Sequence, residues 1–487
     1  MRLVIKKKNI QNYFKMKKIS RILLLINLTG LLLFMGCTQE EIVPLETGKS
    51  INDKQALVRE VSLLLGNVLT NSEVQEVVLS GMREVDKYGE LVSFAYLLGD
   101  KNNLKENEKP VRLKNAGTNF TSTIFRDALV NEFQLNRENY QILSREIKQA
   151  KAKGRLKTTP SSVYDMLTDL LTNERLEIFF PYENALNVQQ LETFYVSYDP
   201  MDGSQTNEVF QFAQGSEGYI TIDEVHNDFV DTNPVFGVVP ICPCDIPGEP
   251  CNFIELVPYD EYYNGDIGQQ PPVFGNTPIL LTHNVRHRDV TDDRFILTTR
   301  IPLIKATNDN WIGFLGRKIH LELVRAAGEG TVTVNANGNI TAKGIEHTIG
   351  NYSIHRRYTW GGGTWLVFPG NYDPHWRMSE YSHSIVAFSH HDLAATGSVT
   401  AGFKSGFKIG TDGNITAHFE QSGSGTIKVE RGAHRFRAIT EISREQALAT
   451  IVGANTTTYV TFGGVNYNVK EIGIIRFIFQ HWTTSLK

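Results

Sequence analysis

The hydrophobic pattern of the chain begins with a helical region. Apolar residues between positions 53 and 70 recur at spacings of three and four, which predicts a helix with one apolar face. Ser72 and Gln75 fit a capping box, so a second helix is predicted from Ser72 to about Tyr88. None of the predicted helices carries a His, Cys or paired-acid constellation, so packing or partner docking is their expected role. The remaining helices are predicted over residues 122–132, 137–153 and 161–172.

From residue 175 the hydrophobic period changes to two, which is typical of strands. Short β-branched and aromatic runs over residues 176–180, 193–198, 209–212 and 218–222 predict a small sheet. Beyond residue 276 almost all of the chain is predicted to be β, as fifteen short strands separated by turns. These strands cover residues 279–287, 294–304, 318–325, 331–336, 339–343, 353–360, 365–368, 383–390, 397–404, 407–410, 414–421, 426–431, 435–442, 457–462 and 472–482.

Together these patterns predict an α+β multidomain protein. A helical module over residues 53–174 is followed by a small β module with a Cys- and Pro-containing loop over residues 175–258. A Pro- and Gly-rich linker over residues 259–276 then leads to an antiparallel β-sandwich module over residues 277–487. The roughly 450 residues that follow position 36 exceed the usual size of a single hydrophobic core, which also favours several domains.

Residues 16–37 have the order of an export signal: three basic residues, a largely apolar run over residues 22–35, and then Gly36 and Cys37. At 1.5 Å per residue the run would span about 21 Å, which is short of the roughly 30 Å hydrocarbon core of a bilayer. We therefore predict a removable signal peptide over residues 1–36 rather than a permanent membrane-spanning helix. Met16 is the expected start, with Met1 as the alternative.

Residues 33–37, Leu-Phe-Met-Gly-Cys, resemble the lipobox of bacterial lipoproteins. The resemblance implies that the Cys37 thiol carries a diacylglycerol, that further acylation follows, and that residues 37–52 form a lipidated tether. Several acyl chains would hold the protein firmly in the membrane. The residue after the cysteine is Thr38 and not Asp, which resembles lipoproteins that are sorted to the outer membrane. Residues 39–41 resemble the acidic surface-export signal of Bacteroidota lipoproteins. The alternative for residues 39–41 is a solvated linker.

The charge of the mature chain disfavours two classes of partner. Removing residues 1–36 removes eight basic residues and no acids, so the formal charge changes from 49 − 53 = −4 to 41 − 53 = −12. A chain this acidic is poorly suited to bind nucleic acid or an anionic membrane surface. We therefore expect no nucleic-acid partner. The lipid anchor in the outer membrane is what the lipobox resemblance implies.

Three cysteines with C-x-C-x6-C spacing lie in a proline-rich stretch, at Cys242, Cys244 and Cys251. Outside the cytoplasm, one disulfide and one free thiol are expected, with Cys251 paired to either Cys244 or Cys242. A zinc site would need a fourth ligand that the sequence does not identify. A catalytic thiol is the remaining alternative, although no nearby histidine supplies a base.

Four histidines and two aspartates fall close together in the β region, but strand geometry separates them. On a strand, His390 and His391 point to opposite faces, and His383 lies roughly 26 Å from His391 at about 3.3 Å per residue. No local metal site and no cofactor are therefore predicted, although a site assembled from other strands stays open. No catalytic residue is assigned, because no known catalytic motif occurs. The six residues are His375, His383, His390, His391, Asp373 and Asp392.

The most suggestive stretch for binding is residues 358–377, which holds three of the five tryptophans among glycines and prolines. Rigid amphipathic rings in loops suit stacking on a sugar or anchoring of a protein partner. The alternative places Trp360 and Trp365 in the sandwich core and leaves only Trp376 exposed. The predicted ligand-binding residues are Trp360, Trp365, Tyr372, His375, Trp376 and Arg377.

These observations predict a lipid-anchored protein of the cell envelope that acts as a binding or adhesion component, with a glycan or a protein as ligand. The alternative is a hydrolase on the secreted side, with its site between the β modules. Three or more convergent His, Asp or Glu side chains lining a cleft would favour the hydrolase.

Overall fold

The computed structural model divides into two compact units, residues 1–54 and 55–487, and the second unit is described below. Among the described residues, no helix combines the length and the apolar character needed to cross a membrane. The predicted signal peptide, Cys37, the strand over residues 279–287, His391 and the three cysteines at 242, 244 and 251 lie outside the described residues. The structure describes residues 51–99, 123–152, 163–241, 253–263, 294–334, 340–378, 380–390, 396–409, 415–432, 434–449, 459–462 and 465–485.

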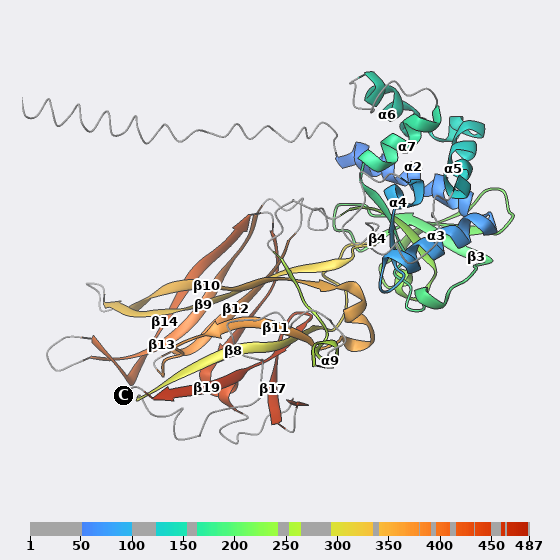
Figure 1. The fold of residues 1–487 in the computed structure, drawn as a ribbon. Coiled ribbons are helices and arrows are strands. Elements are labelled where there is room, and N and C mark those ends of the chain that lie inside the picture. The colour runs from blue at the N-terminus through green and yellow to red at the C-terminus, as the bar shows by residue number, and fades with distance from the viewer. Residues whose placement is uncertain are drawn as a thin grey trace, which may run out of the picture. The chain divides into compact units, whose positions relative to one another are not determined.

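The helices predicted from the apolar spacing are confirmed (Figure 1), but the predicted capping box is wrong. Asn71 caps the second helix, because its side chain accepts from the backbone N–H of Glu73 at 2.9 Å. The Gln75 side chain is buried instead, and its Oε1 accepts from the backbone N–H of Leu191 at 2.6 Å. The helices are α2 (Ile51–Leu69), α3 (Ser72–Val85), α4 (Phe94–Leu98), α5 (Thr123–Leu135), α6 (Gln141–Ala152) and α7 (Val163–Asn173).

The predicted small sheet has six strands, in the order β1-β2-β6-β3-β4-β5. Neighbouring strands are antiparallel except β3 and β6, which are parallel. Strands β1 and β6 were not predicted; β6 is a buried apolar run in the middle of the sheet, so it has no alternating pattern to detect. The strands are β1 (Leu91–Ser93), β2 (Leu176–Phe179), β3 (Thr193–Tyr198), β4 (Thr206–Ala213), β5 (Ile220–His226) and β6 (Val235–Pro240).

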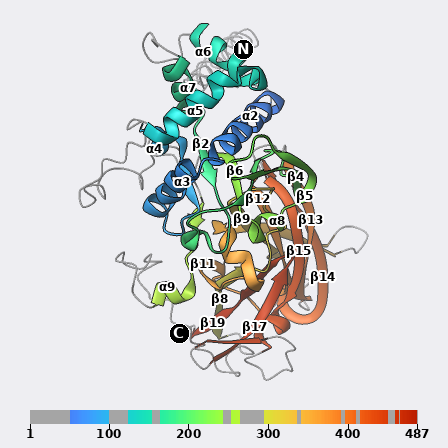
Figure 2. The ribbon, with the colours of Figure 1, turned by 90° about the vertical axis from the view of Figure 1, so that its right-hand side faces the viewer.

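Helices and sheet share one hydrophobic core. Figure 2 shows the ribbons of α2 and α3 beside β2 and β6, which all contribute to it. Val61 of α2, Val78 of α3 and Phe236 of β6 all belong to this buried cluster. Gly66 allows the close approach of α2 to the sheet, because a Cβ at this position would collide with the Phe212 ring. The helices are therefore positioned by this sheet, and one core serves both.

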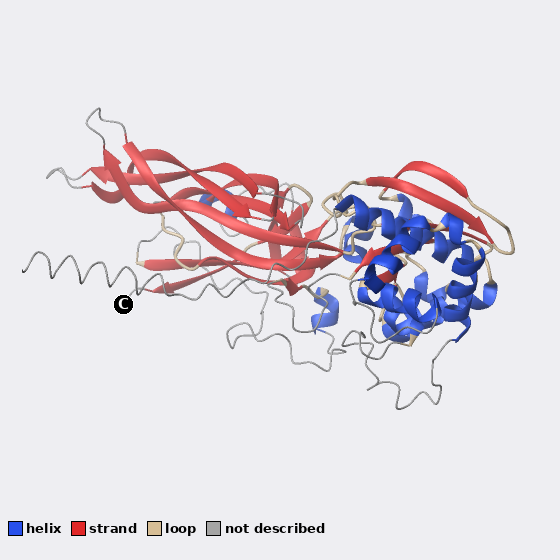
Figure 3. Cartoon of the chain, turned by 90° about the horizontal axis from the view of Figure 1, so that it is seen from above, coloured by secondary structure: helices blue, strands red, loops and turns tan. Residues whose placement is uncertain are grey.

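The rest of the unit is built almost entirely of strands (Figure 3). One sheet has seven strands, in the order β14-β13-β12-β9-β10-β7 with β15 also paired to β12; the other has six, in the order β11-β8-β18-β17-β16 with β19 also paired to β8. The strands are β7 (Ile254–Glu255), β8 (Phe295–Ala306), β9 (Lys318–Val334), β10 (Ile340–His355), β11 (Leu366–Asp373), β12 (Glu380–His390), β13 (Thr396–Ile409), β14 (Ile415–Gly432), β15 (His434–Ser443), β16 (Tyr459–Phe462), β17 (Val465–Ile472), β18 (Ile475–Ile478) and β19 (Gln480–Ser485).

Several strands are longer than predicted, because residues expected to form turns continue the pairing instead. The two strands predicted over residues 318–325 and 331–336 are the single strand β9, and its partner β10 also joins two predictions. Register shifts at Gly344 and Gly350 of β10 absorb the irregularity without ending the strand. Residues 259–263, at the start of the predicted linker, form the short helix α9 (Tyr259–Tyr263).

Side chains of both large sheets meet in one buried cluster. Ile301 and Ile304 of β8 contribute from the six-stranded sheet, and Leu321 and Leu323 of β9 and Ile385 of β12 from the seven-stranded sheet. Strand β9 is also buried on its other face, since Val324 and Ala326 belong to a second cluster with β12, β13 and β14. Helices combined with several largely antiparallel sheets confirm the predicted α+β class.

Candidate functional site

The stretch predicted to bind a ligand is distributed over three elements and does not form one loop. Trp360 lies in the short 3-10 helix η6 (Arg356–Gly362), Trp365 immediately precedes β11, and Trp376 follows it. Trp360 and Trp365 are partly exposed, and His375 and Arg377 are exposed. Tyr372 and Trp376 are only 0% and 1% exposed.

The expectation that Trp376 is exposed is wrong. Its backbone N–H donates to the carbonyl oxygen of Leu297 in β8 at 2.9 Å, which folds the turn between β11 and β12 inward. The indole ring stacks on His383, with 4.7 Å between ring centroids, and its Nε1 donates to the carbonyl oxygen of Glu380 at 3.0 Å. Trp376 is therefore a core residue that covers a buried polar cluster.

That buried polar cluster consists of Asp373, Glu380 and His383, which are 3%, 8% and 0% exposed. The Nε2 atom of His383 is 3.1 Å from Oε2 of Glu380, and its Nδ1 is 3.9 Å from Oδ2 of Asp373. The hydroxyl of Tyr372 lies 3.3 Å from the same Nδ1. Arg325 of β9 forms an ion pair with Asp373, so the cluster contains both charges.

Burial changes the protonation of this cluster. It lowers the pKa of His383 to about 3, with the positive charge of Arg325 acting in the same direction. Burial raises the pKa of Glu380 to about 7, although Arg325 and Arg377 oppose this rise. His383 is therefore neutral at physiological pH, and Glu380 is close to its titration midpoint.

A metal ion could take one nitrogen and two oxygens from this cluster, since the three ligand atoms lie within 4.8 Å of one another. Two features of the geometry oppose such a site. The two carboxylates face opposite ring nitrogens of His383, and Arg325 already supplies a positive charge to Asp373. The arrangement fits a buried network of hydrogen bonds and ion pairs better than a metal centre.

Sequence reasoning selected Asp373 and His383 as suspects but missed Glu380 and Arg325. Residues three apart on a regular strand point to opposite faces, so the strand period gives no reason to place Glu380 beside His383. A register shift between Glu380 and Ser382 in the pairing of β12 with β13 accompanies their convergence. Arg325 reaches the cluster because β9 pairs with β12, which a local pattern cannot reveal.

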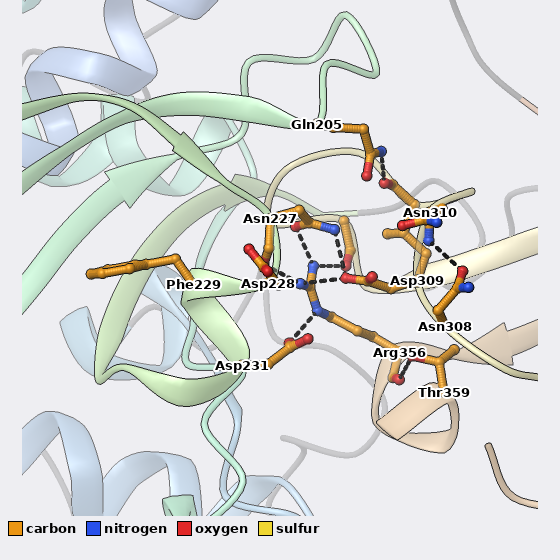
Figure 4. Close-up of polar contacts among 12 residues, drawn as sticks. Gln205, Asn227, Asp228, Phe229, Asp231, Asn308, Asp309, Asn310, Arg356 and Thr359 are labelled. Carbon is orange, nitrogen blue, oxygen red and sulfur yellow. Dashed lines mark hydrogen bonds and ion pairs between the residues drawn. The ribbon is translucent and has the colours of Figure 1, made fainter. Parts of the chain in front are cut away.

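A second polar network surrounds Arg356, which has no exposed surface (Figure 4). Its Nε donates to Asp231 at 2.8 Å, and its Nη2 donates to Asp309 and to the backbone oxygen of Asn227, each at 2.8 Å. The Asn227 side chain also donates to Asp309 at 2.6 Å. These contacts hold the turn after β5, the loop after β8 and the end of β10 together, so the network is structural in character.

Two of the depressions on the surface of the described part of the chain are large enough to hold a small molecule. One has a volume of about 460 Å³, and the other about 380 Å³. None of the three residues of the His383 cluster lines either of them. The larger depression is lined by Glu76, Arg83, Leu186, Asn187 and Gln189, and the smaller by Asp202, Gly203, Ser204, Gln205, Asn310, Arg435 and Arg437.

The chain matches no protein-family model and no curated protein sequence.

Proposed function

We propose that this chain is a lipid-anchored protein of the cell outer membrane whose two large sheets form a β-sandwich that binds a glycan or protein ligand. The lipobox-like residues 33–37 support the anchor, and the acidic mature chain supports a role away from nucleic acid. One structural observation supports binding: a partly exposed aromatic surface around Trp365.

The Trp365 surface consists of Trp365, Phe462, Tyr259 and Lys305, all partly exposed. The Trp365 and Phe462 rings pack edge to face at 5.8 Å, and Tyr259 packs on Phe462 at 5.2 Å. The Lys305 Nζ lies 5.3 Å from the centre of the Trp365 ring and donates to the carbonyl oxygen of Gly362 at 3.0 Å. These contacts fix the orientation of the aromatic rings beside a cation. Such rings are suited to stack on a sugar ring or to anchor a side chain of a protein partner.

Replacing Trp365 by alanine should weaken ligand binding by ~1 kcal/mol or more, because the ring supplies the contact area of this surface. The ligand is first identified by a glycan array and by pull-down from envelope extracts. Affinity is then measured for the purified wild-type protein and the variant. Trp482→Ala is the matched control, since Trp482 is also partly exposed beside a cation, Arg300, but lies outside this surface. Equal affinity of Trp365→Ala and wild type would exclude the Trp365 surface as the binding site.

The anchor has its own test, because acylation requires the Cys37 thiol. We expect Cys37→Ser to abolish incorporation of labelled fatty acid and to leave unprocessed precursor, or protein lost from the membrane fraction. Labelled palmitate followed by membrane fractionation measures both effects. Normal labelling of the Cys37→Ser variant would end the lipoprotein proposal.

The alternative function, a hydrolase, is favoured by one observation, the convergence of Asp373, Glu380 and His383. A carboxyl group with a raised pKa beside a neutral imidazole is chemically suited to proton transfer. The cluster is buried, however, and its three residues line neither of the two depressions described above. Binding is therefore the function that we propose.

A further inference from the structure

The smaller depression is bounded by three segments that are far apart in the sequence. The turn after β3 contributes Ser204 and Gln205, the loop after β8 contributes Asn310, and β15 contributes Arg435 and Arg437. Figure 4 draws Gln205 and Asn310 on their two segments, beside the Arg356 network.

Backbone and side-chain contacts hold the walls of the depression in place. The Phe314 N–H donates to the carbonyl oxygen of Ser204 at 2.6 Å, and the Gln205 amide donates to the carbonyl oxygen of Ile312. Gly313 permits this close approach, since a Cβ there would lie 3.2 Å from the Cα of Gly203. The depression is therefore preformed, which reduces the entropy lost when a ligand binds.

Two arginines give the depression its chemistry. Arg435 and Arg437 both line the depression from β15, where a register shift in the pairing with β12 leaves Arg437 without a residue opposite it. Arg437 donates from Nε to Ser389 Oγ at 2.5 Å and from Nη2 to the carbonyl oxygen of Trp311 at 3.0 Å, which fixes its orientation. Within the described ranges, neither arginine forms an ion pair with a carboxylate, although Asp202 also lines the depression.

The pKa of Arg437 reflects its burial and the nearby positive charge of Arg435. Burial lowers it to about 10, and the like charge of Arg435 acts in the same direction. An anion placed between the two guanidinium groups would relieve their mutual repulsion and would accept paired hydrogen bonds.

We propose that this depression binds the acidic group of a small anionic saccharide, with Arg435 and Arg437 on the carboxylate or sulfate. Asn310 offers an amide group and Ser204 an acceptor oxygen for sugar hydroxyls, and Asp202 accepts from a further hydroxyl while disfavouring a second anion. The volume of about 380 Å³ exceeds that of a single inorganic anion and lies within the usual range for small-molecule sites. The site shares no residue with the Trp365 surface and does not depend on it.

The test is calorimetric titration of the purified full chain with glucuronate, a sulfated disaccharide, glucose and inorganic sulfate. We expect binding of one or both acidic sugars that weakens with added salt, little binding of glucose, and weaker binding of inorganic sulfate than of the bound sugar. Arg435→Gln should reduce the affinity for that sugar about five-fold or more, because one of the two charge-assisted contacts is lost. Arg435 is exposed and forms none of the wall contacts described above, so this variant should fold normally.

Two further variants make the result specific. Arg137→Gln removes an exposed arginine from a helical end and should leave the affinity unchanged. Asp202→Asn should strengthen binding of inorganic sulfate and weaken binding of the acidic sugar. The proposal is overturned if neither acidic sugar binds, if sulfate binds as tightly as the sugar, or if Arg435→Gln and Arg137→Gln have the same affinity.

Discussion

Replacing Trp376 by alanine should lower the free energy of unfolding by about 3–5 kcal/mol, the usual loss for a large aromatic core side chain. The ring is 1% exposed, stacks on His383 at 4.7 Å and packs edge to face on Phe479 at 6.3 Å. The variant also leaves the carbonyl oxygen of Glu380 without its indole donor. Denaturant unfolding of the purified protein, followed by circular dichroism, measures the change.

The comparison for this prediction is Trp482→Ala on β19, because that ring is only partly buried and should be less costly to remove. A Trp376→Ala protein as stable as wild type would contradict the packing described above. That result would favour the expectation from the sequence, in which Trp376 is exposed and contacts the ligand directly.

Replacing Arg356 by glutamine should also destabilise the protein by about 3–5 kcal/mol, because a buried ion network loses its cation. Asp231 and Asp309 would then share a buried site without a positive partner. Burial already raises the pKa of Asp231, and the charge of Arg356 opposes that rise. Without Arg356 the carboxyl should titrate at still higher pH.

The pH dependence of this variant has a definite sign. A carboxyl group whose pKa is raised by folding is tolerated in the folded protein while it is protonated. Once it ionises it opposes folding, so the free energy of unfolding falls as the pH rises. The stability deficit of Arg356→Gln should therefore be larger at pH 8 than at pH 5, as measured by denaturant unfolding at both values. A deficit that is the same at both values would mean that the loss comes from packing and not from the carboxylates.

Arg59 is a matched control that shows how much burial contributes to the stability loss expected for Arg356→Gln. Arg59 makes a comparable paired contact with Glu208, at 2.5 and 3.0 Å, but its side chain is 40% exposed. Arg59→Gln should change stability by about 1 kcal/mol or less, because solvent screens the pair. If Arg356→Gln is no more destabilising than Arg59→Gln, the Arg356 network does not hold its three segments together.

Local patterns predicted the helices well, because an amphipathic helix repeats its apolar spacing within a few residues of sequence. The stripe over residues 53–70 corresponds to α2, and the β-branched run over residues 193–198 is β3. The same method missed β6 and divided β9 and β10, because a central strand has no polar face and a bulged strand looks interrupted at its glycines.

The sequence by itself determined those features that residues close together in the chain specify: the signal-like segment, the helices and the extent of the β region. Tertiary structure decided which side chains meet. Arg356 and Asp231 are 125 residues apart, and the depression draws on segments as distant as Gln205 and Arg437. Strand pairing and sheet packing create these contacts, and both depend on burial of apolar surface over the whole unit, which no local spacing encodes.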